Sequence, residues 1–182
     1  LYVYTAGRNP ENLQSAEVTA VSHASPGVMY ISMKAPGCRQ LTTEIVLMDE
    51  LSTIRISNTL FKEEVKSPEA VRFAFPLNIP EGHMHYDLAF AQCARGKDQL
   101  PGSNKNFITI ENFVDISNED FGITWSSPDA PLIETGKPMN DATLFGYAEN
   151  TEPSQTIFSY VMNNYWETNY KASQAGEVTF IY

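Results

Sequence analysis

The chain of 182 residues has little positive charge and no long hydrophobic run. Twelve Lys and Arg stand against 22 Asp and Glu, which gives a formal net charge of −10. Sparse positive charge argues against a nucleic-acid groove and against an anionic membrane surface as a partner. No apolar stretch approaches the roughly 20 residues of a spanning helix, and no charged-then-apolar leader is present. We therefore expect neither nucleic acid nor membrane as a partner, and neutral polar ligands remain open.

Cysteine is equally scarce, and several catalytic motifs are missing. Cys38 and Cys93 are far apart and form neither a disulfide framework nor a zinc pattern, so we expect two buried free thiols. There is no Gly-x-Ser-x-Gly elbow and no Gly-rich phosphate loop, which leaves a nucleophilic hydrolase or a nucleotide enzyme with little support. An Asn-x-Ser/Thr sequon is also absent.

Helical periodicity hardly occurs, whereas alternation of apolar and polar residues recurs. Three alternating runs predict strands with one face on a core: Ile54, Ile56 and Leu60; Val71, Phe73 and Phe75; and Met84, Tyr86, Leu88 and Phe90. Further strands are expected at 17–24, 28–35, 41–48, 107–116, 121–125, 131–135, 156–162 and 177–182. Eleven prolines disfavour long helices. The sequence predicts an all-β protein with little or no helix.

Turn signals separate these runs at short intervals, which is typical of an antiparallel β-sandwich. Pro101-Gly102 is in the order that a type II turn prefers. Asp115 and Asn118 are expected to cap turns, and Trp125 to fill the core. Residues 137–154, rich in Asn, Asp, Glu and Pro, predict one long exposed loop.

The length fits one domain, and both ends indicate a part of something larger. The chain opens at Leu1 without Met and closes on a strand-like run, 178–182, that reaches the last residue. We expect residues 1–182 to form a single β-sandwich domain or lobe, from a processed product or a longer multidomain polypeptide.

Histidines and carboxylates are candidates for metal binding or acid–base catalysis, but the sequence gives no complete set of ligands or catalytic residues. His83, His85 and Asp87 fall on one strand face, but the remaining histidine, His23, is distant in sequence, so we predict no metal site and solvent-facing histidines. Carboxylates are plentiful: Glu63, Glu64, Glu69, Glu111, Asp115, Asp129, Glu134 and Glu167. Most are expected at the solvated surface, and no pair can be assigned to glycoside hydrolysis.

The run from Met162 to Tyr170 mixes aromatic rings with carboxamides and a carboxylate. Flat rings suit the C–H face of a pyranose, and Asn or Glu side chains suit its hydroxyls. Ordinary half-buried strand residues or interface residues are the alternative interpretation. The candidate carbohydrate-binding residues are Asn164, Tyr165, Trp166 and Asn169; no catalytic residue is predicted.

An ordered series of segments resembles one known family. The series is Lys62 to Val65, Pro68-Glu69, Phe73-Ala74-Phe75-Pro76, Asp98-Gln99-Leu100-Pro101-Gly102, Val114-Asp115-Ile116-Ser117, Gly122-Ile123-Thr124-Trp125, Asp129-Ala130-Pro131-Leu132 and Met162 to Tyr170. From about residue 50 onward the chain resembles the C-terminal β region of bacterial α-mannosidase-like proteins of glycoside hydrolase family 38. The first fifty residues match only in strand character.

The resemblance implies a lobe of a galactose mutarotase-like supersandwich. In that family, retaining hydrolysis of α-mannosides uses zinc and an aspartate nucleophile in an N-terminal α/β domain. Nothing in this sequence resembles that domain, so no zinc ligand, nucleophile or cofactor is assigned to the chain. The implied partners are a mannose-containing glycan and the catalytic α/β domain of the same polypeptide. The compartment stays open, with a periplasmic or secreted protein favoured.

Three functions stay open at this point. The first is a noncatalytic domain of an α-mannosidase-like glycosidase that shapes the carbohydrate cleft. The second is an autonomous carbohydrate-binding module that holds glycans by ring stacking and hydrogen bonds. The third is a mutarotase-like sugar enzyme that uses His and a carboxylate as acid and base.

Overall fold

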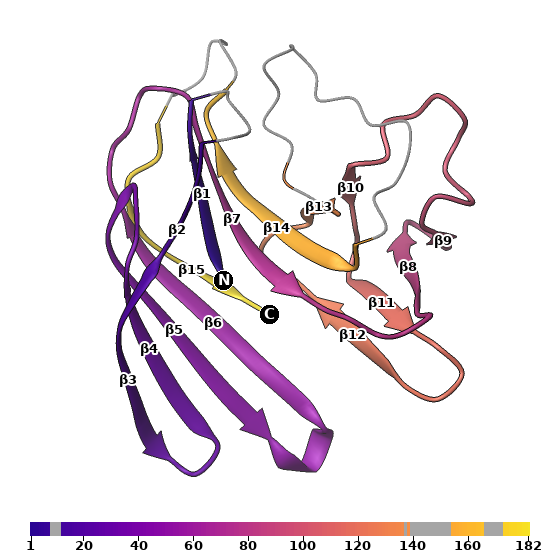
Figure 1. Ribbon diagram of the computed structural model, residues 1–182, viewed down its shortest axis with the longest axis horizontal. Coiled ribbons are helices and arrows are strands. Elements are labelled where there is room, and N and C mark those ends of the chain that lie inside the picture. Colours follow the sequence, from indigo (N-terminus) through magenta and orange to yellow (C-terminus); the bar gives the residue numbers. More distant parts are fainter. Residues whose placement is uncertain (8–11, 137, 139–153, 166–172) are drawn as a thin grey trace.

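The computed structural model describes residues 1–7, 12–136, 138, 154–165 and 173–182. These residues form fifteen β-strands and one short 3₁₀ turn, η1 (Asp49–Leu51), and they contain no α-helix (Figure 1). All strand pairings among them are antiparallel. The predicted all-β antiparallel sandwich with little helix is confirmed.

The strands form three sheets. Sheet A has the order β10 (Phe107–Thr109), β13 (Leu132–Thr135), β14 (Thr156–Asn163), β7 (Glu69–Pro76), β1 (Tyr2–Ala6) and β2 (Leu13–Ser15). Sheet B has the order β15 (Gly176–Ile181), β6 (Thr53–Lys62), β5 (Cys38–Met48), β4 (Val28–Lys34) and β3 (Glu17–Ser25). Sheet C has the order β12 (Gly122–Ser126), β11 (Phe113–Ser117), β8 (His83–Leu88) and β9 (Ala91–Ala94).

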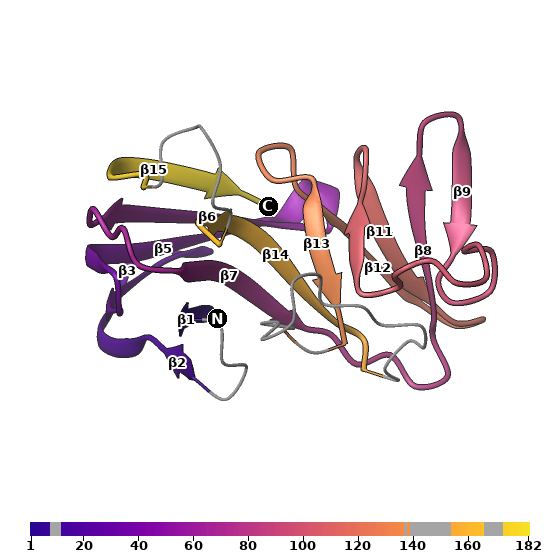
Figure 2. The same cartoon turned by 90° about the horizontal axis from the view of Figure 1, so that it is seen from above.

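Sheet A is one layer of the sandwich, and sheets B and C share the other (Figure 2). A first hydrophobic cluster joins Tyr2 and Phe73 of sheet A to Leu41 and Leu60 of sheet B. A second cluster joins strands β10, β13 and β14 of sheet A to residues of sheet C such as Val114. One face of sheet A is therefore covered in two parts, each by a different sheet.

Aromatic rings fill the junction where the three sheets meet. Tyr182 stacks on Trp125 with ring centroids 5.5 Å apart, and Phe75 lies 4.7 Å from Tyr182 and 5.3 Å from Trp125. Phe75 and Tyr182 pack against both hydrophobic clusters. The prediction that Trp125 fills the core is confirmed, since its side chain is buried at this junction.

Strand β7 differs from the one-sided strand that its alternation predicts. Val71 and Phe73 face the core as expected, but Arg72 on the other face is also fully buried. Its guanidinium pairs with the equally buried Glu134 of β13, donates to Thr5 Oγ1 and lies under the Tyr160 ring. Strand β7, an inner strand of sheet A, is therefore buried on both faces.

Several predicted strand positions were wrong. Ile54 is 56% exposed, because the far part of sheet B extends past the layer that covers its inner face (Figure 1). Phe90 is fully exposed, because β8 ends at Leu88 and Phe90 has a φ of 62° in the following turn. The expected strand 107–116 is two strands, β10 and β11. Strands β1, β2 and β9 were not predicted.

The smaller sequence predictions have mixed outcomes. Cys38 and Cys93 are free, buried thiols in different clusters, as expected. Asn118 caps a turn, because its Oδ1 accepts from the backbone N–H groups of Asp120 and Phe121. Asp115 instead accepts from two hydroxyl groups, those of Ser117 and Thr124. The predicted loop 137–154 lies outside the described residues except for its positions 138 and 154.

The Pro101-Gly102 segment forms the predicted type II turn. The Ser103 N–H donates to the Leu100 carbonyl at 3.1 Å, and Gly102 has a φ of 76°. A Cβ at Gly102 would meet no atom within 4 Å, so only the backbone conformation demands glycine here.

Replacing Gly102 by Ala should therefore lower the free energy of unfolding by about 1 kcal/mol, since alanine is strained at positive φ. Urea denaturation would measure the change. Gly102→Asn is the matched control and should cost less, because asparagine tolerates this region better. Equal stability of Gly102→Ala and the wild type would contradict the turn assignment.

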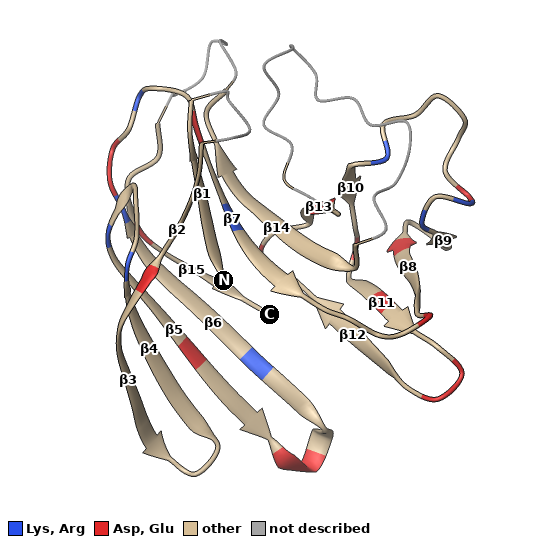
Figure 3. Cartoon of the chain, in the orientation of Figure 1, with Lys and Arg blue, Asp and Glu red and all other residues tan. Residues whose placement is uncertain are grey.

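Charged residues concentrate at turns and strand ends (Figure 3). Asp49 and Glu50, for example, occupy the η1 turn between β5 and β6. Within the part of the chain that the structure describes, no helix is long and apolar enough to cross a membrane.

Candidate functional site

A cavity of about 440 Å³ opens at the end of the sandwich core. It is lined by Lys62, Glu69, Met162, Asn163, Asn164, Ser173, Gln174 and Ala175. These residues come from the end of β6, the start of β7, the end of β14 and the segment that leads into β15. Two regions that are distant in sequence, one with Lys62 and Glu69 and the other with residues 162–164 and 173–175, therefore build one site.

A buried ion pair lies in the wall of the cavity. Lys62 Nζ is 2.6 Å from Glu69 Oε1, and the two side chains are only 2% and 7% exposed. Strand alternation explains their direction: Lys62 is in phase with the buried Leu60, and Glu69 with the buried Val71 and Phe73. Both charges therefore point between sheets B and A and compensate each other away from water.

Neighbouring groups hold the pair in place. Lys62 Nζ donates to the Glu63 carbonyl at 3.0 Å as well as to Glu69 Oε1. The Tyr4 side chain lies beside the Glu69 carboxylate, since burial and then a side-chain hydrogen bond with Glu69 raise the pKa of Tyr4.

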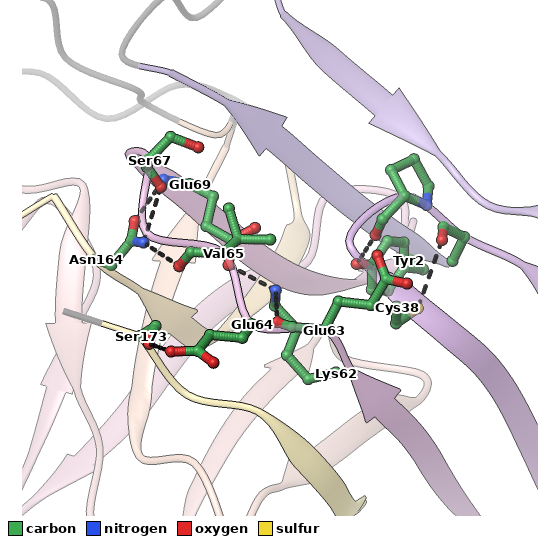
Figure 4. Close-up of polar contacts among 12 residues, drawn as sticks. Tyr2, Cys38, Lys62, Glu63, Glu64, Val65, Ser67, Glu69, Asn164 and Ser173 are labelled. Carbon is green, nitrogen blue, oxygen red and sulfur yellow. Dashed lines mark hydrogen bonds and ion pairs between the residues drawn. The ribbon is translucent and has the colours of Figure 1, made fainter. Parts of the chain in front are cut away.

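Asn164 fastens the β6–β7 connection to the end of β14 (Figure 4). Its Nδ2 donates to the carbonyls of Val65 at 3.1 Å and Ser67 at 2.8 Å, and its Oδ1 accepts from the Glu69 N–H. The Asn164 N–H also donates to the Glu69 carbonyl at 3.1 Å. The carboxamide thus positions Glu69, and Asn164 lines the cavity as a positioning residue.

A bulge in β14 directs Met162 toward the site. Tyr160 is paired with Arg72 on the outer face of sheet A, whereas Met162 is paired with Val71, which faces the core. The irregularity between Tyr160 and Met162 changes the face on which the following side chains lie. Without this extra residue, the apolar side chain of Met162 would point to the outer face.

Ser173 closes the site on the side of β15. Its hydroxyl donates to Glu64 Oε1 at 3.1 Å, and its side chain is buried (Figure 4). This bond ties the segment before β15 to the β6–β7 connection. The same connection is therefore held by Asn164 at one point and by Ser173 at another.

Of the four predicted carbohydrate-binding residues, the structure describes Asn164 and Tyr165. Asn164 lines the cavity, but Tyr165 does not. Burial raises the pKa of Tyr165 to about 12, with the nearby Arg72 guanidinium acting in the opposite direction, so Tyr165 belongs near the Arg72–Glu134 pair. Trp166 and Asn169 lie outside the described residues.

The histidine cluster has no metal-binding geometry. His83 is exposed and His85 is half-buried, while the Asp87 carboxylate accepts hydrogen bonds from the backbone N–H groups at 111, 112 and 113. No group of three or more His, Cys, Asp or Glu side chains within the described ranges is arranged to hold a metal ion. None of the three histidines lines the cavity.

Sequence reasoning missed Lys62 and Glu69 as site residues, and Glu69, Glu134 and Asp87 are buried rather than solvated. The signal was present in the alternation. Lys62 and Glu69 each occupy a position where the strand pattern calls for an apolar side chain. A charge in phase with the apolar face indicates a buried ion that needs a partner.

Fold and site define an antiparallel β-sandwich domain with a polar cavity at one end of its core. No protein-family model matches the chain, and no curated protein matches it either.

Proposed function

We propose that the chain is the noncatalytic β-sandwich region of an α-mannosidase-like glycosidase and forms one wall of its carbohydrate cleft. One observation carries the proposal. Three segments of the family-like series, 62–65, 68–69 and 162–164, converge at the cavity through Lys62, Glu69 and Met162 to Asn164. These three segments, which belong to one ordered series in the sequence, are thus also neighbours in space, as residues with a common function would be.

The lining chemistry supports a sugar as the ligand. Carboxamides of Asn163 and Gln174 offer donors and acceptors for hydroxyl groups, and Met162 adds an apolar surface for C–H groups. The two charges in the wall, Lys62 and Glu69, cancel, which favours a neutral ligand. The run continues in the sequence from Asn164 to Trp166 and Asn169, which are the other proposed carbohydrate-binding residues.

In this proposal the chemistry belongs to another part of the polypeptide. Zinc and the aspartate nucleophile of the family reside in an α/β domain, and no three-ligand group occurs among the residues described here. The contribution of this chain is to bind and orient the glycan. No proton transfer or bond cleavage is assigned to it.

Isothermal titration calorimetry with mannose-containing oligosaccharides tests the proposal. We expect weak binding by the chain, reduced at least tenfold by Trp166→Ala and by Asn169→Ala, because stacking and hydrogen bonds are lost. Phe121→Ala is the matched control, since Phe121 is an exposed aromatic in the turn just before β12. Absence of heat with every glycan would sink the proposal.

A further inference from the structure

We infer that β3, the outer strand of sheet B, pairs with β3 of a second copy of the chain and forms an antiparallel dimer. The two copies of sheet B would join into one sheet that runs through both chains, with Val21 at the two-fold axis. None of the β3 residues lines the cavity described above, so this surface is separate from the proposed glycan-binding wall.

Strand β3 is a long edge strand that buries none of its residues in the single chain. All nine residues, from Glu17 to Ser25, are exposed. Among the described residues, β3 is the last strand of sheet B and pairs with β4 alone (Figure 1). The backbone N–H and C=O groups along its other side are therefore in position to pair with a further strand.

The centre of this edge has few of the features that prevent strands from pairing. Lysine, proline and bulges usually protect an exposed edge. Strand β3 contains neither Lys nor Pro, and its one acidic residue, Glu17, stands at its start. Its pairing with β4 is irregular near both ends, but it is regular from Ala20 to His23. A second strand can therefore align with this central stretch.

The charge distribution allows two copies to meet at this edge. A net charge of −10 makes whole chains repel each other, so a contact between copies needs a surface without acidic groups. Residues 18–33, which span most of β3 and β4, contain no Asp, Glu, Lys or Arg, and Figure 3 shows this part of sheet B without charged residues. The flanking Glu17 and Lys34 lie opposite each other in the pairing of β3 with β4 and have opposite charges.

The side chains of β3 favour antiparallel pairing centred on Val21. Antiparallel pairing places the two Glu17 carboxylates at opposite ends of the contact, whereas parallel pairing would place them side by side. Val21 is 54% exposed and lies on the inner face of sheet B with its partner Ile31. A two-fold axis at Val21 brings the two Val21 side chains together and sets Ala20 opposite Ser22. The contact therefore removes apolar surface from water without opposing like charges.

Sedimentation equilibrium of the full chain tests the dimer. We expect the wild type to shift reversibly from monomer to dimer as its concentration rises through the micromolar range. Val21→Lys should weaken this association at least tenfold, because two ammonium groups would meet at the axis. The substitution also makes the net charge less negative, so greater repulsion between whole chains cannot explain the loss.

A charge swap tests the position of the axis. Val21→Glu should also weaken self-association, but an equimolar mixture of Val21→Lys and Val21→Glu should recover dimers, since opposite charges then face each other. Because Val21 is exposed, both variants should keep the thermal unfolding midpoint of the wild type.

Ile54→Lys is the matched control. Ile54 is 56% exposed on the same inner face of sheet B, but it belongs to β6, which β5 and β4 separate from β3. This variant should dimerise like the wild type, because edge pairing leaves Ile54 outside the contact.

Recovery of dimers in the mixture, with Ile54→Lys unaffected, would support pairing at β3. A wild type that stays monomeric at every concentration would overturn the inference, and so would a dimer that persists in both Val21 variants. Failure of the mixture to dimerise would overturn the axis at Val21. A dimer that Ile54→Lys dissociates and Val21→Lys does not would overturn edge pairing in favour of stacking between inner faces.

Discussion

Replacing Arg72 by Met should lower the free energy of unfolding by about 3–5 kcal/mol, the largest effect expected from a single change in this chain. Arg72 and Glu134 are both fully buried, and their side chains are paired. Removing the guanidinium leaves the Glu134 carboxylate without its charge partner, and it removes the cation beneath the Tyr160 ring. Urea denaturation followed by circular dichroism would measure the change.

Two controls identify the cause. The double variant Arg72→Met with Glu134→Leu should recover much of the loss, because no unpaired buried charge remains. Arg39→Met removes a surface partner of Glu63 at 3.9 Å and should change stability by less than about 1 kcal/mol. If Arg72→Met were as mild as Arg39→Met, the pair would not be buried as described.

Replacing Asp87 by Ala should lower the free energy of unfolding by about 2–4 kcal/mol. The carboxylate accepts from the backbone N–H groups of Glu111, Asn112 and Phe113 and from the Asn112 side chain. These bonds hold the connection between β10 and β11 against the end of β8. Alanine would leave several donors without a partner in a partly buried turn.

The Asp87 carboxylate should also affect how the free energy of unfolding depends on pH in the acid range. Burial acts to raise the pKa of Asp87, but hydrogen bonds from Asn112, Phe113 and Glu111 outweigh it and lower the pKa. A lowered folded-state pKa means that the unfolded chain binds the proton more readily, so stability increases with pH in this range. The contribution is present above the unfolded pKa of about 3.9 and is lost as pH falls through the folded value.

Stability curves of Asp87→Asn and the wild type should therefore converge below about pH 4, as the wild-type carboxylate becomes protonated. Asp120→Asn, on the exposed β11–β12 turn, is the matched control for replacing an aspartate by its amide. A stability difference between Asp87→Asn and the wild type that stays constant from pH 7 to strong acid would contradict the assignment.

Alternation predicted most strands of the fold because one-sided burial leaves a periodic trace. Leu60, Phe73 and Tyr86 are buried as expected. The alternation could not show where the covering layer ends, so the prediction that Ile54 faces the core was wrong. Strand β1 was not predicted because its first four residues are all buried. Both of its faces carry large or apolar side chains, so the alternation disappears.

The site was less predictable than the fold. The chemistry of the run after Met162 indicated Asn164, and that residue does line the cavity. Lys62 and Glu69, which line the same cavity, are far away in sequence, and their approach to Asn164 depends on the β6–β7 connection and on a bulge in β14. Neither feature produces a local sequence pattern from which the proximity of these residues could be predicted.

The Arg72–Glu134 pair also restricts how the central strands can align. If the register of β7 shifted by one residue, the Arg72 side chain would point into the apolar core. Val71 and Phe73 would then lie on the outer face of sheet A, which also carries Glu134. Such a misaligned sheet would carry two unpaired buried charges. The pair therefore disfavours shifted alignments of β7, β14 and β13 and favours their native register, even where its net contribution to stability is small.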